Sequence, residues 1–199
     1  MSASNLARWS GIAAFGTGLI FLVLVLVNSQ DPTITSSLRR QGAGYLMPVL
    51  LIAALLGEMG AIAGLHALQK ERYGRLGVAG ALLSFVAATS QVVVILGFEL
   101  VGVTSSAGSV TLALLFVLSL PALFGGMVLL GVATLRAQVL PRWFGVLFIV
   151  AWFIVATLVL AGLILAGLIV VGVFAYGVFW TVVGYTLFRE GKTRVGRAT

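Results

Sequence analysis

The chain has 199 residues, of which 61% are hydrophobic and only 9% are charged. Soluble domains carry about 25% charged residues, so this composition excludes a soluble globular domain. The net charge of +7 would suit a nucleic-acid partner, but the charges lie in short segments between long apolar runs, as topology signals do. We therefore expect the lipid bilayer as a partner of this chain, and no nucleic acid.

Six apolar runs are long enough to cross a bilayer, which takes about 20 helical residues. Backbone groups in lipid must be satisfied internally, so uninterrupted apolar runs predict helices, whereas barrel strands would alternate. We predict an all-α, polytopic membrane helix bundle that forms a single transmembrane domain over residues 1–199. The predicted transmembrane helices are Trp9–Val27, Tyr45–Leu68, Leu76–Leu100, Val110–Leu135, Trp143–Leu160 and Ala166–Phe188.

Glu58 lies near the middle of the second span, thirteen residues from Tyr45 and ten from Leu68. An acidic side chain at this depth costs roughly 2.5–3.5 kcal/mol on insertion scales. We therefore expect Glu58 to face the bundle interior or a water-filled cavity. Two interpretations stay open: a proton, ion or ligand site, or a neutral residue that hydrogen-bonds a neighbouring helix.

Small residues form a stripe on each of two consecutive spans. The second span carries Gly57, Gly60 and Gly64, and the third carries Gly77, Ala81, Ser84 and Ala88, followed by Gln91. Because small residues let membrane helices approach closely, we predict that these two stripes pack face to face. Helix geometry then places Gln91 only about 8 Å further out than Glu58, which predicts a direct or water-bridged contact between them.

Two more residues are singled out by their positions. Glu99 lies near the outer end of the third span, where it is a candidate ion or ligand contact that pairs with Arg39 or Arg40; a solvated helix end is the alternative. Pro121 falls inside the fourth span and removes one backbone hydrogen bond, which predicts a kink. Such a kink can line a cavity or serve packing alone.

The last two spans are inferred from length, because residues 143–188 contain no charge. As one helix this segment would be about 69 Å long, more than twice the roughly 30 Å hydrocarbon core. We therefore place a turn within residues 161–167, where two glycines weaken the helix. With six spans, ten basic residues lie on the side of both termini and only Arg39 and Arg40 on the other; five spans give six on each side. The positive-inside rule selects six spans with both termini in the cytoplasm.

Two basic turns carry a family resemblance. The sequences AGLHALQKERYGRLG (residues 63–77) and GVATLRAQVLPRWFGVL (residues 131–147) resemble turns of uncharacterised small multi-pass bacterial membrane proteins. The resemblance covers the two turns and their flanking helices. It implies a bacterial plasma (inner) membrane location, and it brings no assigned activity and no catalytic residues.

No combination of residues predicts catalysis. The chain has one histidine and no cysteine, which excludes multi-histidine and thiolate metal sites. It also lacks the nucleophile-elbow, zinc-protease and phosphate-loop motifs. We therefore expect no enzymatic activity, no metal and no cofactor.

Three functions stay open, and the first is the one we favour. It is a non-enzymatic accessory or structural protein that partners other membrane proteins or a second copy of itself. The second is a small transporter or channel-like protein that uses Glu58 with Gln91. The third is a lipid or hydrophobic-ligand binding protein with a pocket near Pro121. Only the transporter needs a water path to Glu58, and the lipid binder needs a groove that opens sideways to the bilayer.

Overall fold

The computed structural model describes residues 3–29, 45–101, 105–162 and 167–195. Six long helices account for nearly all of these ranges, and each is long and apolar enough to cross a membrane. This confirms the predicted all-α bundle: the chain is a multi-pass membrane protein. The helices are α1 (Ala3–Ser29), α3 (Leu46–Gln69), α4 (Gly74–Ile95), α5 (Ser106–Ala137), α6 (Arg142–Gly162) and α7 (Gly167–Val195), and α4 continues into the short π-helical segment η2 (Leu96–Leu100).

Several helices extend beyond the predicted spans. α5 begins at Ser106 because Ser105 caps it: the Ser105 hydroxyl oxygen accepts a hydrogen bond from the Gly108 backbone N–H at 3.3 Å. Such a cap satisfies one of the donors that every helix start leaves unpaired. α7 runs seven residues past Phe188. The break between α6 and α7 comes after Gly162, inside the predicted turn.

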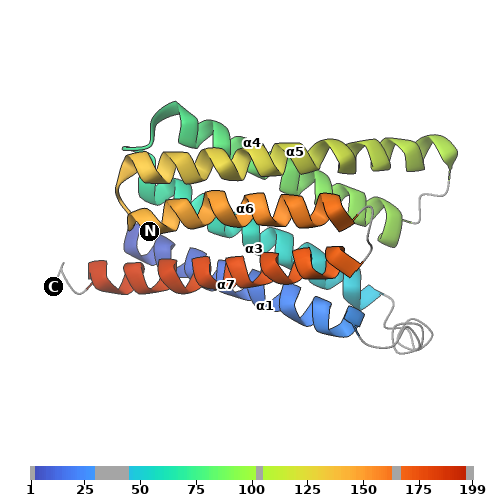
Figure 1. Ribbon diagram of the computed structural model, residues 1–199, viewed down its shortest axis with the longest axis horizontal. Helices are drawn as coiled ribbons and strands as arrows, with labels where there is room; N and C mark the ends of the chain where they lie inside the picture. The colour runs from blue at the N-terminus through green and yellow to red at the C-terminus, as the bar shows by residue number, and fades with distance from the viewer. Residues whose placement is uncertain (1–2, 30–44, 102–104, 163–166, 196–199) are drawn as a thin grey trace.

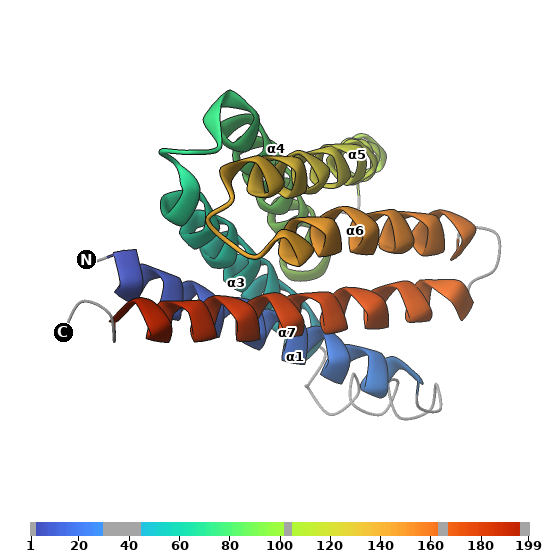
Figure 2. The same cartoon turned by 60° about the vertical axis from the view of Figure 1, so that its left-hand side comes forward.

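The six helices form a closed ring of neighbours (Figure 1, Figure 2). Each helix packs against the next one along the chain, and α1 packs against α7 to close the ring. Both chain ends, the α3–α4 turn and the α5–α6 turn lie at one end of the bundle (Figure 1), so the number of crossings is even, as predicted. The basic residues with described side chains belong to this end, which the positive-inside rule predicts to be cytoplasmic; they are Arg8, Lys70, Arg72, Arg75, Arg136, Arg142 and Arg189.

The first and last helices, α1 and α7, form the most extensive seam of the ring. A Cβ atom on Gly11 would lie 2.9 Å from the Gly184 carbonyl oxygen, and a Cβ on Gly18 would lie 2.6 Å from the Gly177 carbonyl oxygen. On each helix the two glycines are seven residues apart, the spacing that keeps a helix–helix seam in register. The backbones of α1 and α7 therefore touch, and no larger side chain fits at these positions.

The small-residue stripe of α3 packs on α1, so the prediction that it would face α4 is wrong. The residues in contact are Gly57, Gly60 and Gly64 on α3 and Thr17, Ala13 and Ser10 on α1. The Thr17 hydroxyl also donates a hydrogen bond to the Ala54 carbonyl oxygen of α3 at 3.0 Å. A stripe of small residues shows which face of a helix can be approached, but not which helix approaches it.

The small face of α4 packs on α5 instead of α3. A Cβ atom on Gly80 would lie 2.8 Å from the Gly126 carbonyl oxygen, and one on Gly126 would lie 2.8 Å from the Ser84 backbone nitrogen. Gly77 takes no part in this seam, because the ring of Tyr73 covers it. Of the α4 residues predicted to pack on α3, Ser84 thus faces α5 and Gly77 faces the ring of Tyr73, whereas Ala81 lines the space between α3 and α4.

Candidate functional site

Glu58 is the only Asp, Glu, Lys or Arg side chain that the described structure buries, with 0% of its surface exposed. It lies on α3 eleven residues before the helix ends at Gln69, or about 16 Å along the axis. This depth is about half of a roughly 30 Å hydrocarbon core. The Tyr176 hydroxyl of α7 donates a hydrogen bond to Glu58 Oε2. Glu58 thus faces the bundle interior, as the sequence predicts.

Aromatic side chains from three helices hold Tyr176 in place. Its ring lies edge-on to Phe21 of α1, with centroids 4.8 Å apart, and to Trp152 of α6 at 5.3 Å. It also lies edge-on to Trp180 of α7 at 6.2 Å. Edge-to-face pairs contribute about 0.5–1.5 kcal/mol beyond their burial. These rings fix the direction of the Tyr176 hydroxyl, so its bond to Glu58 ties α3 to α7, two helices that are not adjacent in the ring.

The interior still has hydrogen-bonding capacity that the protein does not use. Glu58 Oε1 and the indole Nε1 of Trp152 are buried and have no hydrogen-bond partner among the described residues. An unsatisfied buried polar group costs about 1–3 kcal/mol. Glu58 Oε1 can therefore still take up a proton or accept a hydrogen bond, and the Trp152 indole N–H can still donate one.

Gln91 is not part of this site, and the predicted direct contact with Glu58 is wrong. Oε2 of Glu58 is occupied by Tyr176, and Oε1 has no partner in the described part of the chain. Gln91 is half-buried on α4. It follows Gly80 and Ser84 at helical spacing, so the rotation that turns their face toward α5 also turns Gln91 away from α3.

Glu99 is exposed and lies in η2, at the end of α4 that is remote from both chain termini. Short π-helical segments interrupt regular helices and often mark functional positions. The predicted partners Arg39 and Arg40 lie outside the described residues. The hydrogen bond that defines the site joins Glu58 to Tyr176 and does not involve Glu99.

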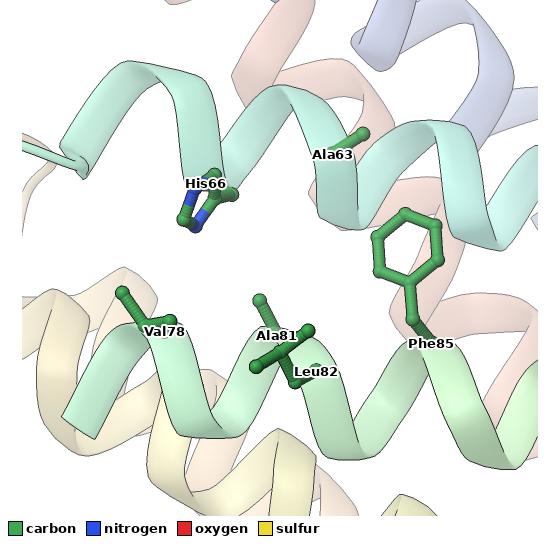
Figure 3. A pocket seen from close by; sticks show the side chains of 6 residues that line it. All are labelled: Ala63, His66, Val78, Ala81, Leu82 and Phe85. Carbon is green, nitrogen blue, oxygen red and sulfur yellow. The ribbon is translucent and has the colours of Figure 1, made fainter. Parts of the chain in front are cut away.

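Pro121 lies inside α5, which is helical from Ser106 to Ala137. Its side chain is exposed, so it is directed away from the bundle interior. The larger of two described grooves is elsewhere, between α3 and α4, and its lining includes Ala63, Ala81 and Phe85 (Figure 3). Among the residues that the structure describes, no three His, Cys, Asp or Glu side chains gather in a way that would hold a metal ion.

The comparisons with known proteins add no family to this description. No protein-family model, no curated protein and no solved structure matches the chain.

Tyr176 is the residue of this site that sequence reasoning missed. It lies 118 positions after Glu58, inside an apolar run where an aromatic residue attracts no attention. A usable signal was present beside it: Gly177 and Gly184 repeat the seven-residue spacing of Gly11 and Gly18. Matching these spacings would have paired α7 with α1 and brought Tyr176 into the interior.

Proposed function

We propose that this chain is a non-enzymatic accessory or structural protein of the membrane, which acts through its helix surfaces on other membrane proteins or on a second copy of itself. The observation that carries the proposal is the complete enclosure of Glu58 and its hydrogen bond from Tyr176. A transport site has to exchange its proton or ion with water. Here the mid-membrane acid is engaged in holding two helices together.

The energetic role of the pair supports this proposal. A hydrogen bond to a group that would otherwise be unsatisfied in the interior is worth more than one at the surface, because losing it leaves a buried orphan that costs about 1–3 kcal/mol. Intramembrane hydrogen bonds between helices average about 0.6 kcal/mol in double-mutant cycles. The Glu58–Tyr176 bond is thus a modest contribution to stability, but it specifies which helices meet.

Glu58→Gln tests the structural role. The amide oxygen of Gln still accepts the Tyr176 hydrogen bond, so we expect the midpoint of thermal unfolding in detergent to change little. Tyr176→Phe keeps the ring packing but removes the donor, so we expect a loss of about 1–3 kcal/mol. If both variants were as stable as the wild type, the bond would not hold α3 to α7.

Proton flux decides between the accessory protein and the transporter. The second function is favoured by one observation, the buried Glu58 Oε1, which has no partner among the described residues. Liposomes that contain the purified protein and a pH-sensitive dye are given a pH gradient. The proposed function predicts the same flux as in protein-free liposomes. A flux that the wild type supports and Glu58→Gln abolishes would overturn the proposal in favour of transport, because Gln cannot release a proton.

We also propose that both termini lie in the cytoplasm and that the membrane is a bacterial plasma membrane. The excess of basic residues at the end that carries both termini supports a cytoplasmic location for that end. The resemblance of residues 63–77 and 131–147 to turns of small bacterial membrane proteins supports a bacterial plasma membrane. Since the chain has no native cysteine, Thr193→Cys can be probed with a membrane-impermeant thiol reagent; in intact cells we expect no labelling.

A further inference from the structure

An open groove separates α3 from α4 near the end of the bundle that carries the termini. Its volume is about 340 Å³, and it is lined by Ala63 and His66 of α3 and by Val78, Ala81, Leu82 and Phe85 of α4. Figure 3 shows the two helices running alongside each other, with His66 and Phe85 directed into the space between them. The α3–α4 seam is the least extensive of the six neighbour seams. The alanines leave space here because their side chains are small, and the closely packed glycines are turned elsewhere, those of α3 toward α1 and Gly80 of α4 toward α5.

One end of this groove is polar and basic. His66 Nδ1 is hydrogen-bonded to the Tyr73 hydroxyl of the α3–α4 turn. Between His66 and Val78 the chain carries three exposed cations, Lys70, Arg72 and Arg75, together with one exposed acid, Glu71. The turn therefore has a net charge of +2 and lies one helical turn beyond the groove on each helix.

We propose that this groove binds an anionic phospholipid of the leaflet at this end of the bundle. One acyl chain lies between α3 and α4 along Ala63, Ala81 and Phe85, and the phosphate lies against the cations of the turn. Two of the side chains that line the groove, Val78 and Leu82, are exposed on the apolar surface of the bundle, so a lipid enters the groove without leaving the membrane. The site goes beyond the proposed accessory function and is independent of the Glu58–Tyr176 pair.

Charge complementarity selects this occupant. A cation near the membrane surface attracts anionic lipid by an amount that corresponds to about fivefold in affinity. A zwitterionic phospholipid gains nothing net from the three cations, although its chains would fit the same apolar walls. A helix from another protein would need a groove along the whole seam, whereas the described lining covers only residues 63–66 of α3 and 78–85 of α4.

Native mass spectrometry of the full chain in a neutral detergent measures the proposed selectivity. The probes are 1-palmitoyl-2-oleoyl phosphatidylglycerol and the matching phosphatidylcholine. We expect the wild type to bind the first lipid at least tenfold more tightly. Arg72→Gln together with Arg75→Gln should reduce this affinity by about 25-fold, at about fivefold for each cation. The matched control removes two cations at the same end of the bundle but away from the groove, Arg136→Gln with Arg142→Gln, and should change it less than threefold.

A second variant tests the groove separately from its charges. Ala63→Trp places a large ring between α3 and α4 and should weaken phosphatidylglycerol binding by at least tenfold. Ile12→Trp, at a half-exposed position on α1, is the control and should have no such effect. Thermal unfolding of each variant in detergent shows that it is folded. Should either double variant fail to fold, its two single substitutions replace it, with about fivefold expected for each at the groove.

Three results would overturn the proposal. Equal affinity for the two lipids would show that the cations select nothing. An equal loss in the two double variants would show that the whole basic end attracts anionic lipid without a site. Unchanged binding in Ala63→Trp would show that the acyl chain does not lie in the groove. None of these results bears on proton flux or on the stability of Glu58→Gln, so the proposed function would stand or fall separately.

Discussion

The α1–α7 seam and the α3–α4 seam are both contacts between antiparallel neighbours, but they differ in every other respect. α1 and α7 come from opposite ends of the chain, and they lie so close that a Cβ atom added at Gly18 would be 2.6 Å from the Gly177 carbonyl oxygen. α3 and α4 are joined by a short turn, yet a groove of about 340 Å³ lies between them. Closeness along the chain therefore does not decide how tightly two helices pack, whereas the placement of small residues does.

The largest expected effect is at the α1–α7 seam. Gly18→Leu should force α1 away from α7, because the added side chain meets the backbone of Gly177 and the side chain of Thr181. Overpacking costs typically 1–3 kcal/mol and occasionally more, so we expect a clear drop in the thermal midpoint in detergent. Gly16→Leu, on the same helix, is the control, because no atom of another described helix lies within 4 Å of its added Cβ. Equal stability of the two variants would mean that this seam is not a close contact.

The reasons why some features could be predicted from the sequence are physical. Six spans follow from local information, since an uninterrupted apolar run of about 20 residues has to be a membrane helix. The fold of residues 143–188 into α6 and α7 follows from length alone. The helix against which each small stripe packs cannot be predicted in this way, because sequence periodicity describes one helix and packing involves two. The small residues of α1 that meet α3 include Ser10 and Thr17. The Ser10 hydroxyl bonds its own helix, whereas the Thr17 hydroxyl lies within hydrogen-bond distance of carbonyl oxygens of both α1 and α3.

The candidate site also has one feature that could be predicted from the sequence and one that could not. The burial of Glu58 was predictable, because an acid at mid-membrane is too costly to leave in lipid. Its partner was not, because Tyr176 meets it only after α7 has closed the ring. Gln91 was the wrong choice for a definable reason: its depth was close to that of Glu58, but depth says nothing about which way a helix is rotated.

An intermediate effect on stability is expected at Tyr73, in the turn between α3 and α4. Burial raises the pKa of the Tyr73 phenol from 10.0 to about 12, so the fold favours its neutral form. The resulting stabilisation is fully present below about pH 10 and is lost as the pH rises toward 12, because the unfolded chain ionises first. Tyr73→Phe also removes the bond to His66, worth about 1 kcal/mol. The unfolding free energies of the wild type and of Tyr73→Phe, measured between pH 8 and 12, should therefore converge at high pH. Parallel curves would contradict the raised pKa of Tyr73.

The smallest effect is expected inside the groove of the α3–α4 seam. Ala63→Leu adds three carbon atoms to an exposed position that lines open space, so the free energy of unfolding in detergent should change by less than about 0.5 kcal/mol. Gly18→Leu is expected to lower the free energy of unfolding by several times as much. If Ala63→Leu and Gly18→Leu were equally destabilising, the contrast between the two seams would disappear.

Closure of the ring by its first and last helices sets an order of events during synthesis. Tyr176 is made 118 residues after Glu58, which at about 5–20 residues per second is a delay of roughly 6–24 s. During that interval Glu58 lacks its donor, and Gly11 and Gly18 of α1 lack the α7 backbone that they contact in the complete fold. A copy that ends before Tyr176 therefore carries an acid in the membrane without the hydrogen-bond donor that the complete fold supplies.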